Sequence, residues 1–359
     1  MKLSYFLLLL SAFALLSCDD DEAEFDRNEF LSFYADEFIQ PSFADLANQT
    51  ASLKSGVETF LNTPNLANLQ SIQNQWTTAY GSWMKVNSFN FGPGGTEGFR
   101  RTILEEIGLW PANVVDIEEK IATNNLDVDD GKRDTRSLLA VEYLIFRDRD
   151  NEATLATFDQ ARLDYLNTII ETINTVVSTA NNEWQTNYAG AFVANNGTEV
   201  TSSTTLMFNE FVRSFESLRD LKVATPMGLI AGLQEAQPDA VEALYSRQSV
   251  DFLRLHWKAL TDLWEGRKSD GTLGVGWRAY IASVDGGDEL IASTEAQIAK
   301  VNQQLDALPA NTTLYELAQN DDPTAMQLER ELQFLTRYFK SDISSLLGLA
   351  ITFSTIDGD

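Results

Sequence analysis

One glutamate lies inside an otherwise apolar run, and its position is the feature of the sequence most able to support chemistry. Glu142 is flanked at helical spacing by Leu138 and Phe146, four residues to either side. A carboxylate buried there is costly unless it gains a cation, hydrogen-bond donors or a proton. Three interpretations are open: a structural ion pair with Arg100, Arg101 or Arg136; a ligand or metal pocket; or an exposed glutamate on a rotated helix.

The chain has one histidine, His256, and one cysteine, Cys18. A single histidine excludes the H-E-x-x-H zinc helix, and a single cysteine excludes intramolecular disulfides and cysteine-rich zinc modules. A Ser-His-Asp triad remains formally open only with His256 as its base, but no G-x-S-x-G elbow occurs. His256 lies between Phe252 and Leu260 at four-residue spacing, which is typical of a packed core histidine.

An acidic segment, Asn125-Leu126-Asp127-Val128-Asp129-Asp130-Gly131, has the alternating oxygen ligands of a calcium loop. Its glycine falls one position too late for an EF-hand, and Arg136 stands where the bidentate glutamate belongs. We therefore expect a polar loop.

The remaining pattern predicts an all-α protein. Apolar residues recur at three- and four-residue spacing, and β-branched alternation is rare. Helices are expected over residues 25–61 with a break or kink at Pro41, and over 66–86, 153–180, 204–221, 247–264, 289–308 and 325–347. Trp76 and Trp83, like Trp257 and Trp264, stand seven residues apart, which favours a core role over a binding groove.

Short loops favour two antiparallel, four-helix-bundle-like halves packed together, with a boundary at Asn195-Asn196-Gly197. We expect a bundle over 25–195 and a second over 196–359. Internal symmetry is faint, although Ala140-Val141-Glu142 recurs as Ala240-Val241-Glu242.

The N-terminus has the composition of a targeting segment. Residues 5–16 form an apolar run that is too short to span a bilayer and is the right length for a signal peptide. The run ends Leu15-Leu16-Ser17-Cys18, which resembles the bacterial lipobox. We expect residues 1–17 to be removed and Cys18 to carry membrane lipid.

The net charge of the chain and its acidic N-terminal segment indicate which partners and which location to expect. The formal net charge of −27 argues against nucleic acid, because phosphate binding needs clustered Lys and Arg. Residues 18–24 form an acidic tether, which resembles the signal that sends lipoproteins to the outer surface in one group of Gram-negative bacteria. The expected location is therefore the outer membrane, lipid-anchored at the cell surface, with its periplasmic face as the alternative.

The segment around Glu142 resembles the imelysin motif G-x-H-x-x-E followed by an aromatic and aliphatic run. Landmarks in the same order are Trp76 and Trp83, Phe91-Gly92-Pro93, Leu109-Trp110-Pro111, Pro226-Met227-Gly228-Leu229, Val241-Glu242-Ala243-Leu244-Tyr245-Ser246 and the terminal Thr352-Phe353-Ser354-Thr355-Ile356-Asp357-Gly358-Asp359. The resemblance covers nearly all of the chain after residue 17. It implies two helical bundles, secretion or lipid anchoring, an association with iron uptake and, for some members, classification as metallopeptidases.

The chain departs from the motif at its decisive positions, because Ser137 replaces the glycine and Leu139 the histidine. Leucine has no lone pair for a metal, and a catalytic zinc needs about three protein ligands. We therefore expect a non-catalytic binding role, with Glu142, Trp76 and Trp110 as ligand-binding candidates and Glu142 as a weak metal ligand. No cofactor is required, and iron or another divalent metal stays open.

Two alternatives remain. One is a metal-dependent peptidase that uses carboxylates and His256. The other is a structural accessory subunit of an outer-membrane uptake complex, whose proteins would then be its partners.

Overall fold

The computed structural model describes residues 25–95, 102–233 and 235–353. The signal segment, the acidic tether, Cys18, Arg100 and Arg101 lie outside these residues. The described part is helical, and its only β-type pairing is an isolated bridge between Arg267 and Leu273. The predicted all-α class is confirmed. None of the described helices is both long and apolar enough to cross a membrane.

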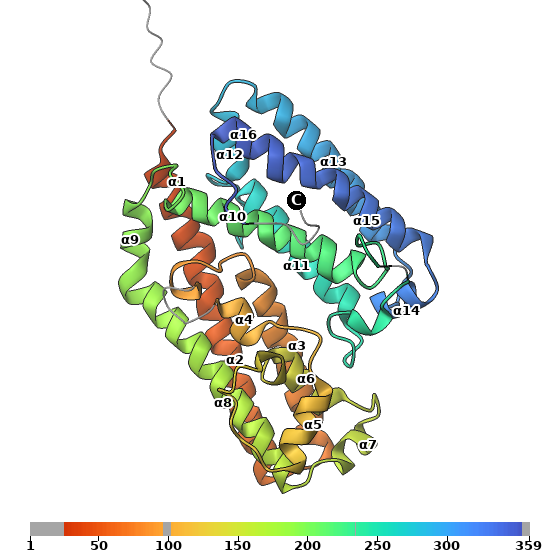
Figure 1. Ribbon diagram of the computed structural model, residues 1–359. Coiled ribbons are helices and arrows are strands. Elements are labelled where there is room, and N and C mark those ends of the chain that lie inside the picture. Colours follow the sequence, from red (N-terminus) through yellow and green to blue (C-terminus); the bar gives the residue numbers. More distant parts are fainter. Residues whose placement is uncertain (1–24, 96–101, 234, 354–359) are drawn as a thin grey trace, which may run out of the picture.

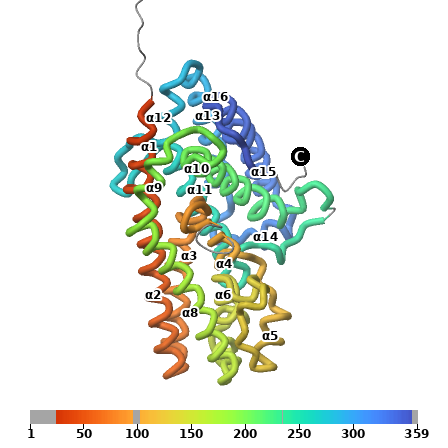
Figure 2. The backbone as a smooth tube through the Cα atoms, turned by 60° about the vertical axis from the view of Figure 1, so that its left-hand side comes forward, coloured from red at the N-terminus to blue at the C-terminus, as the bar shows by residue number. Residues whose placement is uncertain are grey.

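The N-terminal half is built around three long helices, α2, α3 and α8, which lie side by side in the lower part of Figure 1 and as extended rods in Figure 2. Its elements are α1 (Arg27–Tyr34), η1 (Ala35–Ile39), α2 (Gln40–Asn62), α3 (Leu66–Val86), η2 (Gly92–Gly94), α4 (Ile103–Ile107), α5 (Val114–Ala122), η3 (Arg133–Thr135), α6 (Leu138–Phe146), α7 (Asn151–Ala156), α8 (Gln160–Glu183), η4 (Trp184–Tyr188) and α9 (Ala189–Ala194).

The C-terminal half places α10 and α11 against the first half and α13 and α15 on its outer side (Figure 1). Its elements are α10 (Ser203–Glu216), η5 (Ser217–Ala224), η6 (Pro238–Ala240), α11 (Ser249–Glu265), α12 (Trp277–Ala282), α13 (Gly287–Ala307), α14 (Leu314–Gln319), α15 (Pro323–Thr336), η7 (Arg337–Asp342) and α16 (Ile343–Leu347).

Local sequence sets where the long helices begin. The side chains of Asn65, Asp159 and Ser202 each accept a hydrogen bond from the first-turn backbone of α3, α8 and α10. Pro41 does not break the first long helix. Instead, residues Ala35–Ile39 wind as a π-helix just before it, and the helix continues to Asn62. A proline lacks the N–H that would complete the preceding turn, and π-helical turns are a usual way to absorb such a defect.

A close glycine pair turns the chain after α11. Gly266 ends α11 with φ +69°, and a Cβ on Gly276 would lie 2.3 Å from the nitrogen of Gly266. No side chain fits at that approach, so glycine is required at both positions. The turn delivers Trp277 to the start of α12, under the N-terminal helix.

Aromatic residues of α1, and Phe25 just before it, pack directly on the C-terminal half. The ring of Phe30 lies 4.9 Å from that of Trp277, and Phe25 stacks on Tyr280 at 4.2 Å between centroids. The Tyr34 hydroxyl donates to the carbonyl of Leu263 and accepts from the backbone nitrogen of Trp277 at 3.1 Å. The start of the first half is thus packed into the second.

We predict that Tyr34→Phe lowers the free energy of unfolding by about 1–3 kcal/mol, because a fully buried donor and acceptor lose their shared partner. Urea unfolding followed by circular dichroism measures this. Tyr338→Phe is the matched control, because that hydroxyl makes no hydrogen bond to the described residues, and it should change stability by less than about 0.5 kcal/mol. Equal losses in the two variants would contradict the role given to Tyr34.

Candidate functional site

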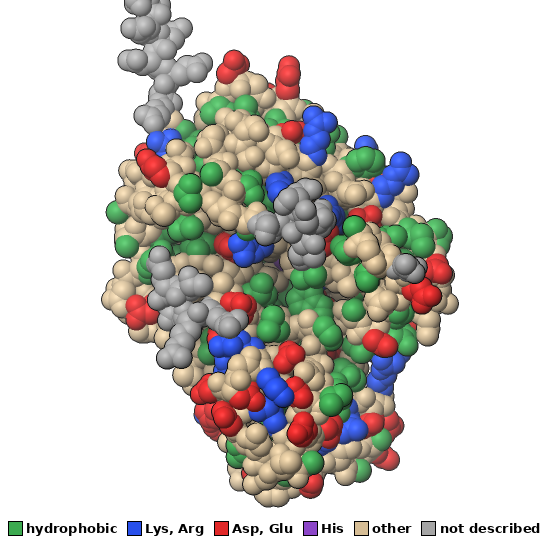
Figure 3. All heavy atoms as spheres, viewed as in Figure 1, with side chains coloured by type: hydrophobic (Ala, Val, Ile, Leu, Met, Phe, Trp, Pro, Cys, Tyr) green, Lys and Arg blue, Asp and Glu red, His purple; other side chains and the backbone are tan. Residues whose placement is uncertain are grey.

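Helices α3 and α11 run in parallel across the joint between the halves. Gln248 donates to the Thr77 hydroxyl at 3.0 Å, and one turn further the ring of Phe252 lies 4.7 Å from that of Tyr80. On the face in Figure 3, hydrophobic side chains gather at the waist between the halves. The joint buries a set of polar side chains that the hydrophobic pattern did not predict.

An ion pair between Lys222 and Glu242 lies at the centre of this set. Both side chains are fully buried, and the Lys222 ammonium lies 2.8 Å from Glu242 Oε2. Tyr80 from α3 donates to Glu242 Oε1 at 2.7 Å. Burial lowers the pKa of Lys222, whereas Glu242 opposes that shift. Tyr80 therefore donates to one oxygen of Glu242, and the charge of Lys222 lies beside the other.

Lys222 lies in η5, an eight-residue π-helical segment that follows α10. Single π-helical turns are frequent at functional sites because they redirect side chains from the regular helical face. The Lys222 ammonium also lies 3.2 Å from the sulfur of Met84 and 5.8 Å from the ring centre of Trp110. Trp110 is partly buried and lies against this ion pair.

Glu142 lies in the same region, on α6, with about 1% of its surface exposed. Its Oε1 accepts a hydrogen bond from the backbone nitrogen of Ser246 at 2.7 Å. Burial and, to a smaller extent, the nearby Glu242 carboxylate raise the pKa of Glu142 to about 7, although the hydrogen bonds from Ser246 and Tyr245 oppose the rise. Near neutral pH this carboxyl is therefore divided between its neutral and charged forms.

The ion pair considered between Glu142 and Arg136 is not formed, because Arg136 pairs with Glu106 on α4 instead. Glu142 obtains backbone donors from the C-terminal half where an arginine was expected. Leu139, at the motif's histidine position, is buried with 2% of its surface exposed. Ser137 caps α6 by accepting from the nitrogen of Ala140 at 3.2 Å, which explains a serine at the motif's glycine position.

The tryptophans predicted to be core residues are buried, and Trp76 also has a polar role. Its indole nitrogen donates to the carbonyl of Leu138 at 2.7 Å, and its ring stacks on Tyr80 at 5.0 Å. Trp76 thus holds the start of α6 against α3, next to Glu142. Trp83, Trp257 and Trp264 are buried as well.

His256 is a fully buried residue of α11, as its apolar spacing predicted. Its Nε2 lies 2.7 Å from the hydroxyl of Ser214, which in turn accepts from Ser88 at 2.9 Å. Burial and the positive Lys222 hold the pKa of His256 well below its usual range. Its Nδ1 has no partner among the described residues, so no carboxylate orients the ring as a triad requires.

A resident metal does not fit these residues. Glu242 is held by Lys222 and Tyr80, Glu142 by Ser246, and His256 by Ser214. In the described ranges, no three His, Cys, Asp or Glu side chains converge to hold a metal ion. The positive charge beside these carboxylates comes from Lys222, which occupies the role a cation would have.

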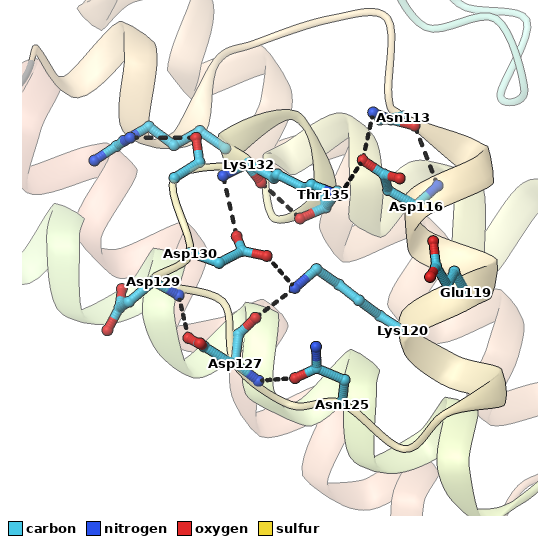
Figure 4. A network of polar contacts seen from close by, with 12 residues as sticks. Asn113, Asp116, Glu119, Lys120, Asn125, Asp127, Asp129, Asp130, Lys132 and Thr135 are labelled. Carbon is cyan, nitrogen blue, oxygen red and sulfur yellow. Dashed lines mark hydrogen bonds and ion pairs between the residues drawn. The ribbon is translucent and has the colours of Figure 1, made fainter.

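A lysine also lies where a metal ion would be expected in the acidic loop that resembles a calcium site. Figure 4 shows the ammonium of Lys120, from α5, lying among the loop oxygens, where it bonds to the carbonyl of Asp127 and, at 2.7 Å, to the carboxylate of Asp130. The side chains of Asn125 and Asp127 turn back to backbone nitrogens at 3.0 Å. The expected polar loop is confirmed, and a lysine provides its central cation.

Sequence reasoning found Glu142 but missed Glu242, Lys222 and Tyr80 as its neighbours. The one sequence signal for Glu242 was the repeat of Ala-Val-Glu, which also contains Glu142. In the structure both glutamates lie close enough to Tyr80 to raise its pKa. No sequence signal marked Lys222, because its burial depends on the π-helical turn.

These features define a class: an all-α protein of two helical halves with a buried polar cluster at the joint. The chain belongs to the imelysin family, whose model matches residues 39–334. It is 23% identical over 251 residues to iron-regulated protein A of Synechococcus elongatus, a match that covers 68% of this chain and 66% of that protein's length.

Two solved structures share the fold. A protein described as an iron-regulated protein A precursor from Parabacteroides distasonis superposes with a TM-score of 0.74 at 17% identity, over 89% of this chain and 95% of the other. An imelysin-like protein from Psychrobacter arcticum gives 0.73 at 17% identity, over 91% and 97%. At these identities the likeness concerns the fold.

We predict that Glu142 makes stability fall as pH rises. Its folded-state pKa of about 7 exceeds the ordinary value of 4.5, so the folded protein binds the proton more tightly. The resulting stabilisation, of about 3 kcal/mol at most, is complete below pH 4.5 and is lost as pH rises through 7.

Urea unfolding of the wild type and Glu142→Gln between pH 4.5 and 8 isolates this contribution. The variant should show a flatter pH dependence over that window, and the exposed control Glu119→Gln should follow the wild type. Parallel curves for wild type and Glu142→Gln would refute the assignment.

Proposed function

We propose that this chain is a membrane-anchored, non-catalytic binding protein with an iron-related role. Family membership and the name of the Synechococcus relative support a link to iron in general. The observation that supports the non-catalytic part is the Lys222–Glu242 pair, because a lysine supplies the counter-charge of this buried carboxylate and leaves it unavailable as a metal ligand.

The buried polar side chains at the joint would support ligand binding by fixing how the two halves pack together. Glu142 hydrogen-bonds the backbone of Ser246 across the two halves, and Trp76 fixes the start of the helix that carries Glu142. Trp110 is partly buried and borders the same cluster, since the Lys222 ammonium lies 5.8 Å from its ring centre. Glu142 thereby acts as structural support for an inter-half ligand pocket.

We predict that the purified protein binds well below one equivalent of zinc and does not cleave unfolded casein. Elemental analysis after dialysis against excess zinc, and a cleavage assay with and without EDTA, measure both. Stoichiometric zinc with EDTA-sensitive cleavage would overturn the non-catalytic proposal in favour of the peptidase. Low-micromolar iron binding that Glu142→Gln abolishes, and Glu119→Gln retains, would assign Glu142 to direct iron binding instead of support.

Anchoring through Cys18 is the second part of the proposal, and the sequence that precedes Cys18 supports it. We predict that the wild-type protein fractionates with outer membranes and that Cys18→Ala, with the signal segment intact, does not. A change of Cys18 to alanine removes the only thiol that could be acylated.

Protease treatment of intact cells separates the two membrane faces, because only a surface-exposed protein is then degraded. Co-purification of the anchored form with an outer-membrane receptor, and its loss in Cys18→Ala, would favour an accessory subunit of an uptake complex. Equal membrane association of both forms would contradict lipid anchoring.

A further inference from the structure

A groove lies at the joint, formed by residues separate from the buried cluster. It has a volume of about 560 Å³ and lies between η1, α2 and α3 of the first half and α11 of the second. This volume is within the range of small-molecule sites. Its apolar lining consists of Phe38, Pro41, Gly81, Phe89, Leu255, Ala259 and Leu263.

The floor of this groove is open because of one glycine. Gly81 lies in the middle of α3, where a Cβ would meet only the side chain of Leu255, at 3.5 Å. Glycine in a helix interior is less favourable than alanine. Leu255, although it faces the groove, remains 43% exposed. The joint therefore leaves apolar surface uncovered at a position where a larger residue would fit.

The parallel register of α3 and α11 determines which charges border the groove. Thr77 lies beside Gln248, Tyr80 beside Phe252, and Gly81 beside Leu255. One turn further, Lys85 and Lys258 therefore project from adjacent positions on the two helices. Both line the groove, together with Arg267.

The positive groups at this rim are more exposed than the carboxylates that pair with them. Lys85 is 56% exposed and its partner Asp45 35%, whereas Lys258 is 65% exposed and Asp262 24%. Arg267 is 40% exposed and pairs with Glu265. Glu37 is the remaining carboxylate of the lining. The lining thus carries three cations and three carboxylates, Glu37, Asp45 and Asp262, in a chain whose net charge is −27.

We propose that this groove binds a small apolar carboxylate, with the hydrocarbon on the floor between Gly81 and Leu255 and the carboxylate at Lys85 and Lys258. The apolar body gains from leaving water, and two ammonium groups on separate halves hold the charged end. The ligand would contact both halves of the molecule. This site is independent of the proposed function, because it shares no residue with the Glu142 cluster.

Isothermal titration with three ten-carbon probes tests both features of the ligand. Decanoate should bind more tightly than decanol, and decylamine should bind most weakly, because the three share a chain and differ in the charge of the head group. Equal affinities for the three probes would overturn the proposal, as would the absence of decanoate binding.

Two matched pairs of variants locate the site. Gly81→Leu fills the floor and should abolish decanoate binding, whereas Gly190→Leu, at a helical glycine with open space around it, should leave binding unchanged. The double variant Lys85→Gln/Lys258→Gln should weaken decanoate about tenfold and leave decanol unaffected, because each exposed contact contributes less than about 1 kcal/mol.

Lys132→Gln is the control for the lysine pair, since Lys132 is 50% exposed and salt-bridged to Asp116 but lies away from the groove. Lys85 and Lys258 are exposed, so their replacement should not disturb the packing of the joint. The double lysine variant therefore tests decanoate binding even if Gly81→Leu fails to fold. Unchanged decanoate binding in the double lysine variant, or an equal loss in Lys132→Gln, would overturn the assignment.

Discussion

The burial of charge at the joint between the halves is the constraint on which the rest of the structure depends. Lys222 and Glu242 come from the second half, and the hydroxyl that completes their pairing, Tyr80, comes from the first. Removal of one partner from a buried ion pair leaves an uncompensated charge, which costs about 3–5 kcal/mol. The observed docking of the halves places the Tyr80 hydroxyl on Glu242 Oε1, so any other arrangement would remove this donor from a buried carboxylate.

This constraint connects local irregularities of the chain to the site. The π-helical segment Ser217–Ala224 turns Lys222 inward, and the capped start of α6 at Ser137 places Glu142 opposite the backbone of Ser246. Trp76 ties these parts together through the carbonyl of Leu138. Hydrophobic packing of α3 on α11 provides the scaffold, and the polar contacts select its register.

The long helices were predictable because their apolar spacing is regular, whereas short helices such as α4, α12 and α14 were not predicted. The buried position of Glu142 was predictable for the same reason, since its neighbours at three and four residues are apolar. The partners of Glu142 were not, because a backbone donor such as Ser246 leaves no trace in side-chain identity. Lys222 shows the same limit: a lysine is ordinarily exposed, and only a tertiary context that includes a π-helical turn buries it.

Lys120 extends this reasoning to the acidic loop after α5. A calcium loop closes only while calcium is supplied, so its shape follows the ion concentration outside the protein. In this protein the cation is the Lys120 ammonium, which is part of the chain. The shape of the loop therefore does not depend on the concentration of any ion in solution. That segment is therefore constitutively ordered with respect to divalent ions, and chelators that unfold a calcium loop would leave it intact.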